Sequence, residues 1–319
     1  MADPPRALIV AGPTCSGKSA LALALAEATG GVVINADSMQ VYRELRILTA
    51  RPSAEDEARA SHRLYGVRAA AEPGSVAWWR AAALAEMAAA QAAERLPILC
   101  GGTGMYFLSL TAGLSDIPDP GSLARQEARA TLAAIGPAAL HAQLTEVDPD
   151  SAARLHPSDG QRIARAWEVW RGTGRGLAAW QAQAGPPSGW DFRAILLDPP
   201  RAALREAIAG RFDAMLAAGA VDEVRALLDQ RLDPSLPAMR AVGVAELAAY
   251  LSGTMPLAAA AAAATLASGQ YTKRQATWFH RHVLAAPTAT HTIHARVAGQ
   301  AQFSQRNWGD LMRFVQGPG

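Results

Sequence analysis

The stretch GPTCSGKS, residues 12–19, decides the fold, because it meets the spacing G-x-x-x-x-G-K-[ST] of a phosphate-binding loop in full. An apolar run, residues 7–11, precedes it, and a helical pattern, residues 17–28, follows it. Backbone N–H groups of such a loop turn inward around phosphate oxygens, and the helix adds the positive end of its dipole. We therefore expect a phosphate-containing ligand to contact Gly12, Pro13, Thr14, Cys15, Ser16, Gly17, Lys18 and Ser19.

Short apolar runs alternate with longer helical patterns through the first hundred residues. In chain order they occupy residues 7–11, 17–28, 32–36, 76–94 and 96–100. This alternation predicts an α/β fold, a P-loop NTPase-like parallel sheet with helices on both faces. Because ligands bind beyond the carboxyl ends of the strands in such sheets, the polar or glycine-rich segments that follow three of these runs predict one shared site.

The pattern changes at a turn-rich stretch, residues 116–121, and from there to about Arg175 it is helical only. We expect a helical insertion here, with Ser158 and Gln161 forming a capping box at the start of one helix. A strand-like run, residues 193–197, then resumes the sheet, and helices are expected from there to the C-terminus. The predicted domains are residues 1–118, the first part of the core, residues 119–175, the helical insertion, and residues 176–319, the second part of the core with basic C-terminal helices.

Composition narrows the class of protein. The chain has 319 residues, 50% of them hydrophobic, and two cysteines, too few for a disulfide framework. The N-terminus has no apolar leader pattern, and the alanine run at residues 258–264 is short and typical of a helix, so a soluble cytoplasmic protein without a membrane segment is expected. From Arg240 to the end, seven Lys and Arg residues face two acids, so a polyanion could dock there.

Asp37 ends the second strand-like run, where its carboxylate would face the bound phosphates and Mg²⁺. The alternative is that it caps the next turn, as Asp often does after a strand. Residues 97–102 end in glycines instead of a metal-binding acid, which argues against the hypothesis that the protein is an ATPase. Two other classes stay open on the residues alone: a small-molecule P-loop kinase that consumes ATP, and a non-catalytic, nucleotide-dependent RNA-binding module.

Five motifs in this order and spacing resemble the tRNA dimethylallyltransferase family, the tRNA isopentenyltransferases, over residues 8–282. They are GPTCSGKS, NADSMQVYR, PILCGGTGMYF, DPDSAARLHPSDGQRIARAWEVWRGTGR and YTKRQATWFHRH. The resemblance implies transfer of a dimethylallyl group from dimethylallyl diphosphate to N6 of the adenosine 3′ to the anticodon, position 37 of tRNA, with release of diphosphate. No Cys/His metal pair follows His294, so the zinc finger of the family's eukaryotic members is absent and a bacterial-type enzyme is implied. We expect it to be a monomer.

The resemblance implies a role for each residue of the reaction. Asp37 matches the family's general base, and Thr103 matches the hydroxyl that helps to hold the adenine. Lys18 and Arg211 would stabilise the leaving diphosphate, and Ser19 would act through Mg²⁺, the expected cofactor. An adenine N6 amine is a poor nucleophile, so a proton acceptor within hydrogen-bond reach is needed in any case.

RNA contacts are expected on basic helices. Arg162 and Arg165 share one helix face, for which a merely solvated face is the alternative, and Lys273, Arg274 and Trp278 mix cations with an aromatic ring. The expected tRNA contacts are Asp37, Ser38, Met39, Gln40, Thr103, Arg125, Gln161, Arg162, Ile163, Ala164, Arg165, Arg240, Lys273, Arg274, Gln275 and Trp278.

The chain departs from the family's usual pattern at two positions near these residues. Ala207 stands where the family often has a second arginine one helical turn before Arg211, and Val244 stands where it usually has a tyrosine. These departures put individual supporting contacts in doubt, and the reaction itself is still expected.

Overall fold

The computed structural model describes residues 4–183 and 185–317, which divide into two compact units. The sheet unit comprises Met1–Thr111 and Ser188–Gly319, and the helical unit comprises Ala112–Pro187. Both boundaries predicted for the insertion, residues 119 and 175, lie inside the helical unit. The helical unit thus extends beyond the predicted insertion at each end.

The sheet unit is built on six parallel strands in the order β3-β2-β4-β1-β5-β6. The strands are β1 (Arg6–Ala11), β2 (Val32–Asn35), β3 (Ser61–Arg63), β4 (Pro97–Gly101), β5 (Asp191–Leu197) and β6 (Thr290–Ile293). The predicted α/β fold with a parallel sheet is confirmed. The strand that leads into the phosphate loop, β1, lies inside the sheet, with β4 on one side and β5 on the other.

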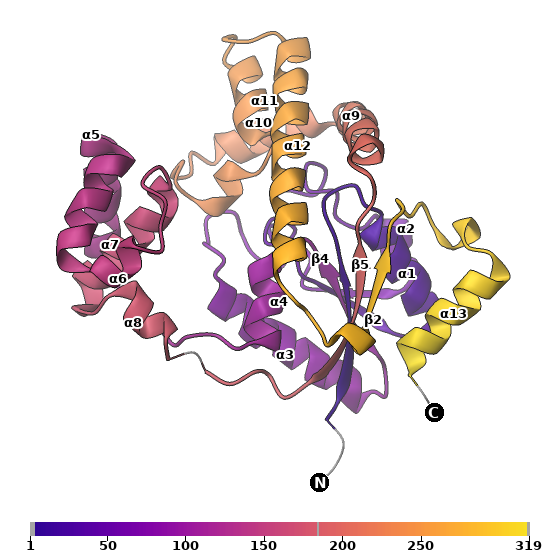
Figure 1. The fold of residues 1–319 in the computed structure, drawn as a ribbon. Helices are drawn as coiled ribbons and strands as arrows, with labels where there is room; N and C mark the ends of the chain where they lie inside the picture. The colour runs from indigo at the N-terminus through magenta and orange to yellow at the C-terminus, as the bar shows by residue number, and fades with distance from the viewer. Residues whose placement is uncertain (1–3, 184, 318–319) are drawn as a thin grey trace. The chain divides into compact units, whose positions relative to one another are not determined.

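Helices cover both faces of the sheet, because alternate strand residues point to opposite sides. Ile9 packs on one side, with helices α3 (Val76–Ala92) and α4 (Gly104–Thr111). Leu8 and Val10 pack on the other side, with α1 (Lys18–Thr29) and α13 (Gln305–Gln316). Figure 1 labels β2, β4 and β5, with α3 and α4 on one side of them and α1 and α13 on the other. This double covering leaves the ends of the strands as the place where a ligand can approach.

A second core of the sheet unit is helical. Tyr42 and Leu45 pack there with buried side chains of four helices, α9 (Arg201–Ala217), α10 (Ala220–Asp229), α11 (Val244–Leu251) and α12 (Leu257–Arg281). Short elements complete the unit, namely α2 (Ala54–Arg59), η1 (Pro237–Arg240), η2 (Pro287–Ala289) and η3 (Gln300–Gln302). None of the helices within residues 4–183 and 185–317 combines the length and hydrophobicity that crossing a membrane requires.

The helical unit consists of α5 (Gly121–Val147), α6 (Pro149–Ala152), α7 (Gly160–Thr173) and α8 (Leu177–Gln181). Its core includes Leu140 and Ile163, both fully buried. The predicted capping box at Ser158 is wrong, because the N-cap of α7 is Asp159, whose side chain accepts the Arg162 N–H at 3.2 Å. The Ser158 hydroxyl instead lies 2.8 Å from Nδ1 of His156.

Two strands were missed by the sequence analysis. β3 has three residues and β6 has four, and both carry polar side chains that are partly or fully exposed. The expectation of helices only after residue 197 is therefore wrong at β6, which adds the edge strand beside β5. Neither strand shows the apolar run or the strict alternation on which the prediction relied.

The register of the sheet brings three loops to one edge. Ala11 pairs with Gly101, and Asn35 pairs with Cys100, so β1, β2 and β4 end at the same level. A Cβ on Gly101 would lie 2.1 Å from the Ala36 backbone, so only glycine allows these two chains to approach so closely. The phosphate loop and the segments that follow Ala36 and Gly101 consequently meet above the strand ends.

We predict that Trp79 is a main stabilising residue beneath this edge. It is fully buried, its Nε1 donates to the Asn35 carbonyl at 2.7 Å, and its ring stacks on Tyr106 with 4.2 Å between centroids. Trp79→Phe, which leaves that carbonyl unpaired, should lower the free energy of unfolding by about 1–3 kcal/mol, and Trp79→Ala by about 3–5 kcal/mol. Urea titration followed by circular dichroism measures both.

Leu266→Ala is the control for this prediction, because Leu266 is 65% exposed on α12 and its truncation should shift stability by no more than about 0.5 kcal/mol. Equal urea midpoints for Trp79→Ala and Leu266→Ala would contradict the assignment of Trp79 to the core.

Candidate active site

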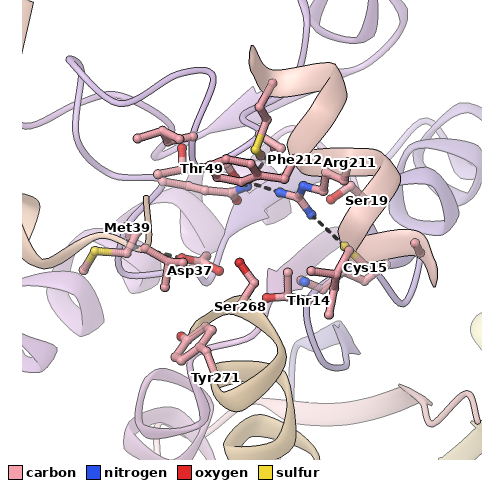
Figure 2. Close-up of a pocket in the computed structure, with 18 of the residues that line it drawn as sticks. Thr14, Cys15, Ser19, Asp37, Met39, Thr49, Arg211, Phe212, Ser268 and Tyr271 are labelled. Atoms are coloured by element: carbon pink, nitrogen blue, oxygen red, sulfur yellow. Dashed lines mark hydrogen bonds between the residues drawn. The ribbon is translucent and has the colours of Figure 1, made fainter. Parts of the chain in front are cut away.

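A cavity of about 410 Å³ lies in the sheet unit beside the phosphate loop. Loop residues line it together with Asp37, residues 48–50, one face of α9, one face of α12 and Arg296. Figure 2 shows these side chains converging from the loop and the surrounding helices. Part of the lining is polar and charged, and another part is apolar, formed by Leu48, Ile208, Phe212, Met215 and Val242.

The phosphate loop takes the predicted strand-loop-helix form. Thr14, Cys15, Gly17, Lys18 and Ser19 line the cavity. The other three predicted loop residues, Gly12, Pro13 and Ser16, are buried and support the turn, in which Ser16 N donates to Pro13 O at 3.2 Å. Ser16 Oγ is buried without a hydrogen-bond partner among the described residues. The side chains that the loop brings to the cavity are therefore one ammonium, one thiol and two hydroxyls.

Lys18 places a buried positive charge at the base of the cavity. It is 9% exposed, and its Nζ donates to Pro13 O at 3.4 Å. No carboxylate of the described residues lies within ion-pair distance of it. Burial lowers the pKa of this ammonium, and the negative charge of Asp37 opposes that shift. Because a buried charge without a close counterion is costly, the site favours an anionic ligand.

Arg211 brings a second cation to the loop from α9. Its guanidinium donates to Cys15 Sγ at 3.6 Å and to Thr49 O at 3.4 Å, the two dashed contacts drawn in Figure 2. Neither acceptor is a carboxylate, and no acid of the described residues forms an ion pair with Arg211, which lines the cavity as an unpaired cation. The structure thus brings together Lys18 and Arg211, as the sequence analysis expected.

Asp37 both caps a turn and faces the cavity. Its Oδ1 accepts the Met39 N–H at 2.9 Å, and its own N–H donates to Asn35 Oδ1 at 2.9 Å. The turn-capping alternative is therefore present in the structure, yet it uses only one carboxylate oxygen. Oδ2 accepts no hydrogen bond from any described residue, which leaves it available to a ligand.

Thr103 is held near Asp37 by hydrogen bonds to Ser38, the residue that follows Asp37. Its Oγ1 accepts the Ser38 N–H at 2.9 Å and donates to Ser38 Oγ at 3.3 Å. Tyr271 also lines the cavity, and its side chain lies near those of Thr103 and Gln275. Burial, and then the charge of Asp37, raises the pKa of Tyr271 well above its ordinary value, so its hydroxyl stays protonated at neutral pH. The residues around Asp37 form one polar group of hydroxyls.

Tyr271 was missed by the sequence analysis, and Gln275 was given another role. Gln275 is 5% exposed; its Oε1 accepts from Thr14 N at 2.8 Å and Thr14 Oγ1 at 3.0 Å. Its Nε2 donates to Gly102 O at 3.0 Å. The predicted tRNA contact is not available in this structure, because the Gln275 amide is occupied in joining two loops. The spacing of Tyr271 and Gln275, one helical turn apart, was the signal that both lie on one face of α12.

The remaining residues predicted to contact tRNA divide by exposure. In the sheet unit, Lys273, Arg274 and Arg240 are exposed, whereas Gln40 is 9% exposed and donates to Thr49 O and Ala50 O. Trp278 is half-buried and stacks on His282 with 4.0 Å between ring centroids. Gln40 and Trp278 therefore contribute to the packing of the sheet unit, and their predicted contact with tRNA stays a prediction.

In the helical unit, Ile163 is the prediction that the structure contradicts, because its side chain is fully buried in the core and has no free surface. Gln161 is exposed, and Ala164 is half-buried. The cations of this unit form ion pairs, Arg125 with Asp119, Arg162 with Asp159 at 3.4 Å, and Arg165 with Glu168.

Comparison with known proteins places these features in a family. The family model for IPP transferase matches residues 40–282. The tRNA dimethylallyltransferase of Granulibacter bethesdensis is 60% identical over 98% of this chain and 98% of its own length. That of Gluconacetobacter diazotrophicus is 61% identical over 97% of this chain and 93% of its own length.

Solved structures agree. The tRNA isopentenylpyrophosphate transferase of Bacillus halodurans is 28% identical, with a TM-score of 0.66 over 98% of this chain and 97% of that one. A eukaryotic dimethylallyltransferase acting on tRNA is 22% identical and shares the fold, with a TM-score of 0.78 over 97% of this chain and 78% of that one. Because a family model matches most of the chain and relatives about 60% identical match nearly all of it, the chain belongs to the IPP transferase family of tRNA dimethylallyltransferases.

Proposed function

We propose that this chain transfers the dimethylallyl group of dimethylallyl diphosphate to N6 of the adenosine at position 37 of tRNA, 3′ to the anticodon, and releases diphosphate. One observation carries the proposal. In one cavity, cations that include Lys18 and Arg211 lie together with the Asp37 carboxylate, one oxygen of which accepts no hydrogen bond from the described residues. Cations suit a departing diphosphate, and a free carboxylate oxygen suits an amine that must lose a proton.

The chemistry balances on these groups. The N6 lone pair attacks the allylic carbon, the bond between that carbon and the diphosphate oxygen breaks, and the electron pair leaves with the diphosphate. Oδ2 of Asp37 takes the N6 proton while Oδ1 stays bonded to Met39 N, so the carboxylate remains oriented. Lys18 and Arg211 stabilise the negative charge that grows on the leaving group.

The apolar part of the lining supports the choice of donor. Leu48, Ile208, Phe212 and Met215 present hydrocarbon surface in the same cavity as the cations. A dimethylallyl group can occupy that part while its diphosphate lies on the phosphate loop. Hydrocarbon walls also exclude water, which would otherwise compete with the amine for the allylic carbon.

The donor set fits Mg²⁺ that is held largely by the ligand. Among the described residues no cluster of three His, Cys, Asp or Glu side chains could hold a metal. Ser19 and Asp37 do line the cavity with hard oxygen atoms, and Mg²⁺ commonly combines one or two such ligands with phosphate oxygens and water. Ser19 would hold the ion, which would neutralise diphosphate charge.

For the nucleic acid, the proposal needs the target base outside its stack, because Asp37 lies within a cavity. The hydroxyls of Thr103 and Ser38 beside Asp37 can hydrogen-bond an adenine edge. Exposed cations of α12, Lys273 and Arg274, would hold backbone phosphates, joined by Arg240 and by Arg125, Arg162 and Arg165 of the helical unit. We propose that the chain acts as a monomer.

Membership of a transferase family argues against the small-molecule kinase and the non-catalytic RNA-binding module. The direct test is to incubate the protein with an unmodified anticodon stem-loop and either dimethylallyl diphosphate or ATP, and then to weigh the RNA. The proposal expects a mass gain of one dimethylallyl group with the first donor and none with ATP. A phosphorylated product, or RNA binding without any gain, would contradict it.

We predict that Asp37→Asn lowers single-turnover transfer by roughly 10²- to 10⁴-fold, because the amide cannot take the N6 proton. The amide oxygen can still accept from Met39 N, so the turn and the melting temperature should be nearly unchanged. Single-turnover prenylation of a stem-loop, beside a melting curve, measures both.

Asp37→Ala is the matched variant, because it removes the turn contact as well and should lower the melting temperature. A wild-type rate for Asp37→Asn would refute the role of Asp37 as base. Recovery of that rate at high Mg²⁺ would show instead that Asp37 acts as a metal ligand.

We predict that Lys18→Ala abolishes prenyl transfer and leaves stem-loop affinity unchanged, since Lys18 lies at the base of the cavity and meets only the diphosphate. Filter binding of labelled stem-loop and mass analysis of the product measure the two effects. If Lys18→Ala also weakened stem-loop binding, the prediction would be wrong and the phosphate loop would belong to the RNA-binding surface.

We predict that Arg274→Ala weakens RNA binding for all sequences and reduces the slope of log affinity against log salt by about one unit. Arg274 is exposed on α12, with its guanidinium 5.7 Å from the Tyr271 ring centroid. The control is Arg306→Ala on α13, which removes the same charge from another exposed position. If the slope of log affinity against log salt were equal for the two variants, Arg274 would not contact an RNA phosphate and would serve packing alone.

A further inference from the structure

The segment that follows β6 is fixed against the phosphate loop. Val297 is 1% exposed, and its N–H donates to Ser16 O at 2.9 Å. Gly17 adopts φ +93°, and a Cβ there would lie 1.7 Å from Val297 O. Backbone therefore meets backbone at this point, and the residue before Val297 is held at a defined place beside the loop.

That residue, Arg296, presents a positive charge to the cavity. Its Nε donates to Cys15 O at 3.1 Å, which orients the guanidinium along the loop. Its two terminal nitrogens have no hydrogen-bond partner among the described residues, and no described carboxylate lies within ion-pair distance of them. Arg296 lines the cavity together with Lys18 and Arg211. An oriented guanidinium with free donors is suited to a phosphate group.

The position of Ala207 gives Arg296 access to the ligand. Ala207 lies one helical turn before Arg211 on α9 and lines the same cavity, so from this face α9 supplies one cation only. A second hollow is lined by Ala207, Arg211 and Arg296, with Glu206 and the small residues Ala203 and Gly210. The methyl group of Ala207 is short enough to leave the space between the two guanidinium groups open to a ligand.

We propose that Arg296 binds the diphosphate leaving group as a second guanidinium that acts with Arg211, an inference that rests on the proposed function. The Nε bond to Cys15 O orients the side chain, and its terminal nitrogens donate to diphosphate oxygens. A guanidinium in this place adds charge stabilisation without taking part in proton transfer. The C-terminal segment is then part of the active site, although it lies beyond residues 40–282 that match the family model.

The test is the affinity of the full-length protein for inorganic pyrophosphate with Mg²⁺, measured by titration calorimetry, since binding does not require turnover. Arg296→Gln keeps a donor for Cys15 O and removes the charge, and it should weaken pyrophosphate binding about 10- to 100-fold. Arg296→Lys, which keeps the charge, should lose less. Stem-loop affinity and melting temperature should stay at the wild-type values for both.

Two further variants separate charge from structure. Arg313→Ala removes an exposed C-terminal cation that lines neither hollow, and should bind pyrophosphate as the wild type does. Adding Ala207→Arg to Arg296→Gln places a guanidinium back in the same cavity, and should recover most of the lost affinity.

Wild-type pyrophosphate affinity in Arg296→Gln, with a loss in Arg211→Ala, would overturn the inference and leave the proposed function standing. A loss in Arg296→Gln that comes with a lower melting temperature and is not recovered by Ala207→Arg would also overturn it, because Arg296 would then only support the loop. Failure of the proposed function would look different: the wild-type protein would neither bind pyrophosphate nor modify the stem-loop.

Discussion

The site depends on the hydrogen bonds of one buried amide, Gln275. On one side it accepts from Thr14 of the phosphate loop, and on the other it donates to Gly102, next to Thr103. The part of the cavity suited to a diphosphate and the part suited to a base are thereby held at a fixed separation. Loss of the amide would leave the Thr14 N–H and the Gly102 carbonyl unpaired, and each such group costs about 1–3 kcal/mol when buried. For an in-line displacement, this fixed separation matters as much as either binding region.

Two features of the cavity are energetically unfavourable, a buried cation and a strained backbone conformation. Lys18 is buried without a close counterion, and Cys15 adopts φ +65°, a left-handed conformation that a side chain disfavours. Each feature would be unfavourable in an empty structural loop. Both become useful once an anion is present, because the ligand supplies the missing charge and the turned backbone points its N–H groups at that ligand.

The sequence was sufficient to predict the phosphate loop, the parallel sheet and the meeting of Asp37 with Thr103, since a fixed motif and the order of strands determine all three. It was insufficient for Gln275, because a helical pattern alone does not show which face of α12 meets the loop. The sequence analysis also could not predict the contact between Arg296 and Cys15. The two residues are 281 positions apart, and their contact depends on strand β6, which was not predicted. For Asp37, the hypothesis of a turn cap and the hypothesis of a ligand-facing carboxylate are compatible. One oxygen accepts a backbone N–H of the turn, and the other is left to the cavity.

The division of the chain into two units has a consequence for recognition. All residues of the cavity belong to the sheet unit, so the chemistry is complete there without the helical unit. Two arginines of the helical unit, by contrast, form ion pairs in the free protein, Arg162 with Asp159 and Arg165 with Glu168. Exposed pairs of this kind contribute only about 0–1 kcal/mol, so an RNA phosphate can replace a carboxylate at small cost. Under the proposed function, pairing would keep these arginines oriented before RNA binds, whereas the cations of the cavity, which have no carboxylate partner among the described residues, would receive the diphosphate directly.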